Sequence, residues 1–200
     1  DSLSIGNTSA GQYATVIAFN DTCEHISFTN STIQGSSRYP TSVSTALIWD
    51  ERGTTHNSHN VTFENNEILN GAYSFYIYGA SSSITLQQDK WIIKNNRITG
   101  WGYYAIYSYY NRNIEIVNNT ITSGTNVYFF ARSLYLYYNG TPTITGNTIY
   151  NGANGYGYGL YMANCFGLSN NRNDISNNSI HVIGAQYGMY ITGCNYSDVY

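Results

Sequence analysis

Apolar and polar residues alternate over short segments along the whole chain, and no segment has the period of an amphipathic helix. Such alternation is typical of β-strands that bury one face. The segments are separated by turns rich in Asn, Gly and Ser, which tolerate tight turns and left-handed backbone. The pattern therefore predicts an all-β protein built from many short strands.

Two repeats are interleaved along this pattern. In the first, spaced apolar residues lead into an Asn-containing turn and then an isoleucine; these isoleucines lie 23 to 35 residues apart. They are Ile33, Ile68, Ile98, Ile121, Ile149 and Ile180. In the second repeat, a small residue precedes an apolar residue, Tyr and a further residue, as at 74–78, 105–109, 133–137, 159–163 and 188–192. A unit of this size cannot bury its own apolar face, so the repeats predict a stacked solenoid.

Stacked strands lie about 4.8 Å apart, so equivalent residues form columns along the solenoid axis. The residue two positions before each closing isoleucine is almost always asparagine. Asparagine in a column can donate its amide N–H to the next side-chain carbonyl, and its backbone tolerates a turn conformation. We therefore expect an asparagine ladder. It contains Asn66, Asn96, Asn119, Asn147 and Asn178, with Ser31 in the first copy.

These segments resemble the repeats of right-handed parallel β-helices, the pectate-lyase-like superfold. The resemblance covers essentially the whole chain and implies one domain over residues 1–200, a right-handed parallel β-helix of about seven coils with an internal asparagine ladder. By this likeness the Tyr segments are first strands, segments such as 114–117 are second strands, and the Asn turns lead into third strands. The superfold carries many functions, so the resemblance implies a fold more than an activity.

The two ends of the chain show no recognisable cap. Residues 1–11 are similar to a second strand that runs into an Asn turn, and residues 195–200 are similar to the start of another second strand. Terminal repeats usually need a polar cap or a helix. Three alternatives stay open: a segment that continues into a flanking β-helix, a subunit that stacks head to tail with itself into a filament, or a local cap.

The tyrosines of the first-strand segments are the main candidate site. Side chains alternate along a strand, so these tyrosines should point outward, where enzymes of the resembling family carry catalytic Asp, Arg and Lys. A row of aromatic rings suits a sugar chain, suits a protein surface, or forms a self-stacked ladder that only stiffens the coil. The candidate binding residues are Tyr76, Tyr78, Tyr107, Tyr109, Tyr135, Tyr137, Tyr161 and Tyr190.

Candidate catalytic residues are sparse. The densest group of charged residues, at 48–60, offers Asp50, Glu51, His56 and His59 for acid–base or metal chemistry. Adjacent carboxylates diverge on an extended chain, so a solvated loop is the favoured interpretation. The resemblance implies Ca²⁺ held by several Asp in lyases, and Asp pairs with a Gly-His-Gly element in hydrolases; the sequence has neither pattern. We expect no metal and no cofactor.

Two cysteines predict a covalent link between coils. Cys165 and Cys194 each lie five residues after the first apolar position of their first-strand segment, so they should share a column in neighbouring coils. The coil spacing falls within the range of about 4.4–6.8 Å between the Cα atoms of disulfides. We therefore expect a Cys165–Cys194 disulfide and an oxidising compartment, with two stacked thiols as the alternative. Cys23 has no evident partner.

Composition narrows the partner classes. Only 10% of residues are charged and the net charge is −3, without the cluster of Lys and Arg that nucleic-acid binding needs. No apolar run reaches the ~18 residues of a membrane span. The sequence favours a non-catalytic extracellular or cell-surface module, structural or adhesive, that binds protein or polysaccharide through its tyrosines. A polysaccharide lyase or glycoside hydrolase is the competing hypothesis.

Overall fold

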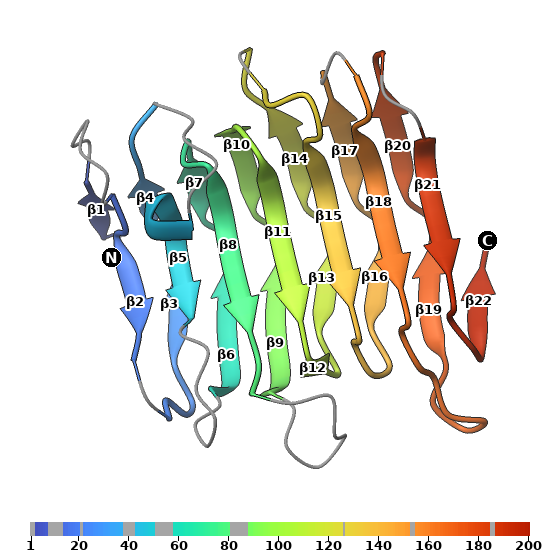
Figure 1. The fold of residues 1–200 in the computed structure, drawn as a ribbon. Helices are drawn as coiled ribbons and strands as arrows, with labels where there is room; N and C mark the ends of the chain where they lie inside the picture. The colour runs from blue at the N-terminus through green and yellow to red at the C-terminus, as the bar shows by residue number, and fades with distance from the viewer. Residues whose placement is uncertain are drawn as a thin grey trace.

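The computed structural model describes residues 3–7, 14–20, 22–37, 43–50, 58–80, 88–125, 127–152, 155–184 and 187–200. These residues form short strands and one 3₁₀ helix, η1 (Val43–Thr45), with every strand pairing in parallel. In each turn the chain adds one strand to each of three sheets (Figure 1). Each new strand pairs with the strand of the preceding turn in the same sheet. Each sheet is a path of seven stacked strands, which corresponds to about six full turns from its first strand to its last.

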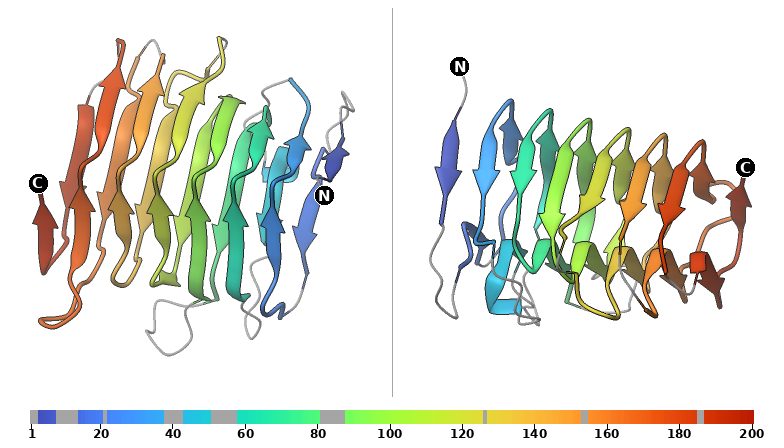
Figure 2. Two further views of the ribbon diagram at one scale, coloured as in Figure 1. Left: turned by 180° about the vertical axis from the view of Figure 1, so that it is seen from behind. Right: turned by 90° about the horizontal axis from the view of Figure 1, so that it is seen from above.

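We number the sheets by the predicted strand types. Sheet 1 consists of β2 (Ile17–Phe19), β5 (Ala46–Asp50), β8 (Tyr73–Tyr78), β11 (Tyr104–Tyr109), β15 (Arg132–Tyr137), β18 (Tyr158–Ala163) and β21 (Tyr187–Thr192). Sheet 2 consists of β3 (Ser27–Thr29), β6 (His59–Glu64), β9 (Gln88–Lys94), β13 (Glu115–Val117), β16 (Thr143–Thr145), β19 (Asn173–Ser176) and β22 (Ser197–Val199), and β12 (Asn111–Arg112) pairs with β9. Sheet 3 consists of β1 (Ser4–Gly6), β4 (Thr32–Gln34), β7 (Glu67–Leu69), β10 (Arg97–Trp101), β14 (Thr120–Ser123), β17 (Thr148–Asn151) and β20 (Ser179–Val182). The views in Figure 2 show the coils following one another along a single axis.

One strand assignment from the sequence is wrong. β1 pairs with β4 in sheet 3, with Ile5 opposite Ile33, and is therefore a third strand instead of a second strand. Second and third strands share the same short alternation, so the pattern alone could not separate them. The Asn7 N–H bonds to the carbonyl of Gln34 and continues the sheet 3 pairing. The C-terminal prediction is confirmed, because β22 pairs with β19 in sheet 2.

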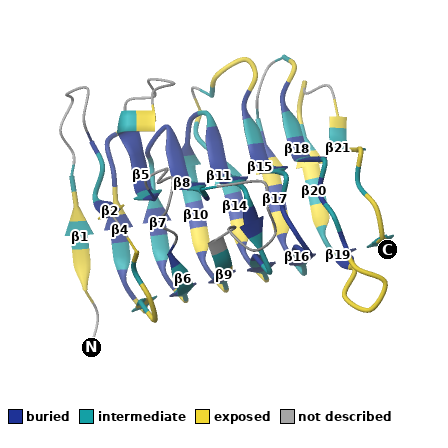
Figure 3. Cartoon of the chain, turned by 60° about the horizontal axis from the view of Figure 1, so that its bottom comes forward, coloured by how far each residue is buried: buried dark blue, intermediate teal, exposed yellow. Residues whose placement is uncertain are grey.

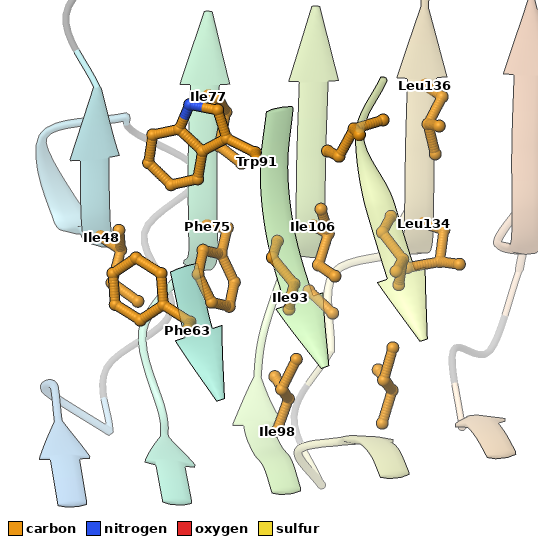
Figure 4. Packing of buried hydrophobic residues seen from close by; sticks show 14 of the residues in the cluster. Ile48, Phe63, Phe75, Ile77, Trp91, Ile93, Ile98, Ile106, Leu134 and Leu136 are labelled. Carbon is orange, nitrogen blue, oxygen red and sulfur yellow. The ribbon is translucent and has the colours of Figure 1, made fainter. Parts of the chain in front are cut away.

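The core is a set of apolar columns inside the coil. Figure 3 shows buried positions alternating with more exposed ones along the strands. The closing isoleucines lie opposite one another in sheet 3, and Ile33, Ile68 and Ile98 are fully buried. Large rings fill the coils nearer the N-terminus, among them Phe63, Phe75 and Trp91 (Figure 4). The ring of Phe63 packs between that of Phe28 at 4.8 Å and that of Trp91 at 6.1 Å. Like residues stacked on like residues supply the buried apolar area that one coil lacks.

The turn from sheet 2 to sheet 3 carries the predicted asparagine column. The Asn119 Oδ1 accepts the backbone N–H of Asn96 at 2.9 Å and its Nδ2 at 3.1 Å. The Asn119 Nδ2 in turn donates to the Ile93 carbonyl at 2.8 Å and to the Asn147 Oδ1 at 3.0 Å. The same bonds link Asn66 to Asn96 and Asn147 to Asn178. The column therefore satisfies polar groups that would otherwise be buried without partners.

The residue before each ladder position has a left-handed backbone, which explains the Asn pairs of the repeat. These residues, with φ between 51° and 69°, are Asn30, Asn65, Asn95, Asn118, Gly146 and Asn177. Asn and Gly are the residues that adopt this conformation most readily. The first residue of each pair shapes the turn, and the second enters the ladder.

Candidate functional site

The outer surface of sheet 1 brings the eight predicted tyrosines together; we call these residues the tyrosine face. One column runs through Trp49, Tyr76, Tyr107, Tyr135, Tyr161 and Tyr190. A second column pairs Tyr78 with Tyr109 and Tyr109 with Tyr137. All eight are half-buried. The sheet register produces the columns, because each Tyr segment occupies the same place in its coil.

The tyrosine rings stack on one another along the solenoid axis. Neighbouring ring centroids from Tyr76 to Tyr190 lie 4.9, 5.0, 5.0 and 5.3 Å apart, with planes within 17° of parallel. The second column has spacings of 4.6 and 5.1 Å. Each inner ring therefore has a neighbour on both faces and leaves mainly its edge to the surface.

A third column, which the sequence reasoning missed, borders the tyrosine face. It pairs Tyr73 with Tyr104, Tyr104 with Arg132, Arg132 with Tyr158, and Tyr158 with Tyr187. Tyr73 and Tyr104 are only 5% exposed and form a small aromatic core outside the coil. The signal was present in the sequence, because the first residue of four of these strands is Tyr.

Arg132 interrupts this column and lies among tyrosine rings. Its Cζ is 5.0 and 4.7 Å from the ring centroids of Tyr135 and Tyr161, and 5.1 Å from that of Tyr158. Its Nη1 donates to the Tyr104 Oη at 3.0 Å. Cation–π contacts of this kind hold a guanidinium in a fixed place.

Four exposed rings extend the aromatic surface past the edge of sheet 1. We call Tyr128, Phe129, Phe130 and Tyr156 the turn cluster; they are 43–51% exposed. Phe129 and Phe130 both contact the ring of Tyr156. The ring of Tyr128 lies 5.0 Å from that of Tyr103, which lies 4.3 Å from that of Tyr104. The turn cluster and the tyrosine face are therefore one continuous network of rings.

Burial raises the pKa of several phenols in this network of rings. Burial raises the pKa of Tyr135 to about 12, against the opposing charge of Arg132. Burial, followed by the neighbouring phenols, raises the pKa of Tyr107 well above its usual range, and burial does the same for Tyr73 and Tyr104. These tyrosines stay protonated while the coils remain stacked.

Alkaline solution should therefore unfold the protein. Unfolded tyrosines ionise near pH 10, whereas Tyr73, Tyr104, Tyr107 and Tyr135 hold their protons in the native state. The unfolded state therefore binds fewer protons above that pH. The stability is complete below pH 10 and falls as the pH rises through the raised native values. Circular dichroism and tyrosinate absorbance, followed from pH 8 to pH 12, should show a late group of tyrosines ionising together with unfolding. Ionisation of all tyrosines near pH 10 in a still folded protein would contradict the stacking.

The candidate catalytic residues do not form a site in the described part of the chain. Asp50 ends β5 in an inward column between Phe19 and Ile77, is 2% exposed, and accepts a hydrogen bond from Ser58 at 3.2 Å. The expected solvated position of Asp50 is therefore wrong, because the alternation of β5 turns its last side chain inward.

His59 starts β6 and is half-buried, while Glu51 and His56 lie outside the described residues. No group of three or more His, Cys, Asp or Glu that could hold a metal is found in the described ranges.

Cys165 and Cys194 share a column, but both thiols are free and the predicted disulfide is not formed in the structure. The Cys194 Sγ accepts the backbone N–H of Cys165 at 3.3 Å and lies 3.3 Å from the Thr192 carbonyl. Asn111 and Asn139 make equivalent contacts with backbone carbonyls in the preceding coils. The cysteines thus continue a second ladder, at the turn from sheet 1 to sheet 2. A coil spacing of about 4.8 Å also exceeds the mean Cβ separation of disulfides, about 3.8 Å.

The two thiols should differ in reactivity. The hydrogen bond from the Cys165 thiol lowers the pKa of Cys194 to about 7, against the opposing effect of burial. Burial raises the pKa of Cys165. At pH 7.5, iodoacetamide should alkylate Cys194 well before Cys165, because the thiolate is the nucleophile. Mass spectrometry of the denatured, non-reduced protein should then find all three cysteines alkylated; a linked Cys165–Cys194 peptide would contradict the free-thiol ladder.

Charged side chains gather away from the tyrosine face. Ion pairs join Glu64 to Lys94 at 3.2 Å and Asp89 to Arg112 at 3.0 Å, both in sheet 2. Others join Arg97 to Glu67 in sheet 3, and Arg172 to Asp198 at the C-terminal end of sheet 2. Within the described strands of sheet 1, Arg132 is the one charged side chain on the outer surface.

Comparison with known proteins agrees with this architecture. A protein-family model described as right handed beta helix region matches residues 15–199. Neither the curated proteins nor the solved structures include a significant match. Among the described residues, no helix has the length and apolar character to cross a membrane. The match spans nearly the full chain and the coils have the corresponding fold, so the chain belongs to the right-handed β-helix family.

Proposed function

We propose that this β-helix is a non-catalytic extracellular or cell-surface module, structural or adhesive, that contacts another protein through its tyrosine face. The observation that carries the proposal is the continuous network of rings over sheet 1 and the turn cluster. Soluble monomers rarely expose large contiguous apolar patches, and such patches commonly mark interaction surfaces. Many right-handed β-helix domains are extracellular, which supports the proposed location.

The ring geometry favours a protein partner over a sugar chain. A sugar stacks best on the open face of an aromatic ring, but the inner rings of the tyrosine face already have neighbours on both faces. What they offer is a row of ring edges and hydroxyl groups. Protein interfaces are enriched in Tyr, Trp and Arg and depleted in other charged residues, which is the composition of this surface.

Stacking also prepares the surface for binding. Each tyrosine has few rotatable bonds, and its neighbours hold the ring in place before a partner arrives. Binding therefore loses little side-chain entropy. A ladder that stiffens the coil and a ladder that binds a partner are compatible, because the same rings keep their edges at the surface.

Peptide selection tests the proposal without knowledge of the natural partner. A library of displayed random peptides would be selected on the whole chain, and the bound peptides would be located by protection of individual tyrosines from nitration. We expect the peptides to converge on the tyrosine face, because the few residues that dominate interface energies are enriched in Trp, Tyr and Arg. Peptides that protect only tyrosines elsewhere, such as Tyr150 and Tyr196, would overturn the proposal.

The same experiment with polysaccharides tests the two alternatives, a glycan-binding module and an enzyme. Pectin, alginate and a neutral β-glucan would be tested for the same protection, and for product release with and without Ca²⁺. The proposal expects neither. Protection by a polysaccharide would replace the protein partner with a glycan, and robust product release would replace the module with a lyase or hydrolase.

Head-to-tail stacking of subunits stays a separate prediction. Electron microscopy at increasing concentration would show filaments of constant width if copies stack along the axis. Particles that remain single and short at every concentration would contradict the prediction of a filament-forming subunit.

A further inference from the structure

Tyrosine rings hold Arg132 in place, but its N–H groups have few hydrogen-bond acceptors among the described residues. A guanidinium carries five N–H donors, and among the described residues Arg132 has one acceptor, the Tyr104 Oη at 3.0 Å. The Arg132 Nε is enclosed, and the described part of the chain offers it no hydrogen-bond acceptor. Tyrosine rings at 4.7–5.1 Å surround the charge and displace water from it. The cation is therefore partly desolvated before any partner binds.

No carboxylate compensates this charge within the described chain. The other described arginines, Arg97, Arg112 and Arg172, each have an acidic partner. Arg132 lies instead in the middle of the aromatic surface, beside β11 and β18. A partly desolvated and unpaired cation at the centre of an interaction surface is electrostatically complementary to an anion on the partner.

Stacking alone does not account for an arginine at this position. The column reads Tyr73, Tyr104, Arg132, Tyr158 and Tyr187, and the tyrosines on either side already stack with their own neighbours. A tyrosine at 132 would continue the column without introducing a charge. The arginine adds what a tyrosine lacks, namely a planar pair of donors that matches a carboxylate.

We propose that Arg132 is the anchor for an Asp or Glu carboxylate of an acidic protein partner that docks on the tyrosine face. This inference rests on the proposed function and names the partner's chemistry. The carboxylate accepts from the outer Nη groups, while the surrounding rings exclude water and strengthen the bond. The tyrosines supply the contact area, and Arg132 selects partners that present an acid at the matching point.

Arg132→Tyr is the decisive variant, because it extends the tyrosine column while removing the charge. Peptides selected on the wild-type chain would be measured against wild type, Arg132→Tyr and Arg132→Lys. Each peptide would also be made with its Asp and Glu replaced by Asn and Gln. We expect the selected peptides to be acidic and to bind Arg132→Tyr at least about tenfold more weakly, with Arg132→Lys in between.

Measuring both the acidic and the amide peptides against wild type and Arg132→Tyr shows whether Arg132 binds a carboxylate or has only a structural role. If Arg132 anchors a carboxylate, the amide peptide and Arg132→Tyr each lose affinity, and combining them loses little more. Equal affinity of wild type and Arg132→Tyr for acidic peptides would show a purely structural arginine and overturn the inference. Selected peptides without acids that still protect the tyrosine face would also overturn it, while leaving the proposed function intact. Peptides that avoid the face would defeat both.

Discussion

Replacing Asn119 by alanine should lower the free energy of unfolding by about 3–5 kcal/mol. The side chain accepts two hydrogen bonds from Asn96 and donates to the Ile93 carbonyl and to Asn147. Alanine would leave these groups buried in a turn with 1% exposure at residue 119, where water cannot replace the lost partners. Each buried group without a partner costs about 1–3 kcal/mol, so the loss should exceed that of a surface change several-fold.

The adjacent asparagine is the matched control. Asn118 is exposed and has a φ of 54°, a conformation that glycine adopts readily. Asn118→Gly should therefore change the stability by less than about 1 kcal/mol. Urea denaturation of both variants measures the difference. Similar small losses for Asn118→Gly and Asn119→Ala would mean that the ladder contributes little.

Removing the ring of Phe63 should have a comparable effect, about 3–5 kcal/mol. Phe63 is fully buried, and its ring contacts those of Phe28, Phe75 and Trp91. Phe63→Ala would open a cavity at the junction of two coils, where the stacked strands cannot collapse without breaking register. The loss combines the transfer free energy of the ring with the cost of the cavity.

Phe129→Ala makes the same chemical change on the surface. Phe129 belongs to the turn cluster and is 47% exposed, so its loss should cost less than about 1 kcal/mol. Thermal melts of Phe63→Ala and Phe129→Ala give the comparison. Equal shifts of the melting temperature would contradict the assignment of Phe63 to the core.

The stacked architecture could be predicted because one short pattern encodes two physical requirements. In each Asn pair, the first residue adopts the left-handed turn and the second bonds to the next coil, as Asn118 and Asn119 show. Chance rarely repeats such a pair just before a closing isoleucine in one coil after another. The same periodicity placed Tyr76 and Tyr107 in one column.

The second ladder was harder to recognise because its chemistry changes along the column. Asn111 and Asn139 give way to Cys165 and Cys194, whose sulfurs take over the hydrogen bonds of the amides. The spacing of the two cysteines predicts a disulfide only if the column is considered without its asparagines. A left-handed residue precedes each position, as Tyr138 does for Asn139, but tyrosine is not a usual signal for that conformation.

The position of the candidate site could be predicted from the sequence, but the stacking of its rings could not. Alternation places a tyrosine on the outer surface, whereas ring stacking depends on side-chain angles that the sequence does not specify. The contacts around Arg132 come from its own strand, through Tyr135, and from the coils on either side, through Tyr104 and Tyr161. The inward position of Asp50 depended on the register of β5, which short alternation leaves open.

The most direct test of the tyrosine face compares two double variants with the selected peptides. Tyr107→Ser with Tyr135→Ser removes stacked rings from the tyrosine face, and Tyr150→Ser with Tyr196→Ser removes rings from other surfaces. Melting curves would first establish that both variants fold. A protein-binding tyrosine face predicts that the first variant loses at least about tenfold in affinity while the second binds like wild type. Unchanged binding by the first variant, or an equal loss in both, would contradict that role.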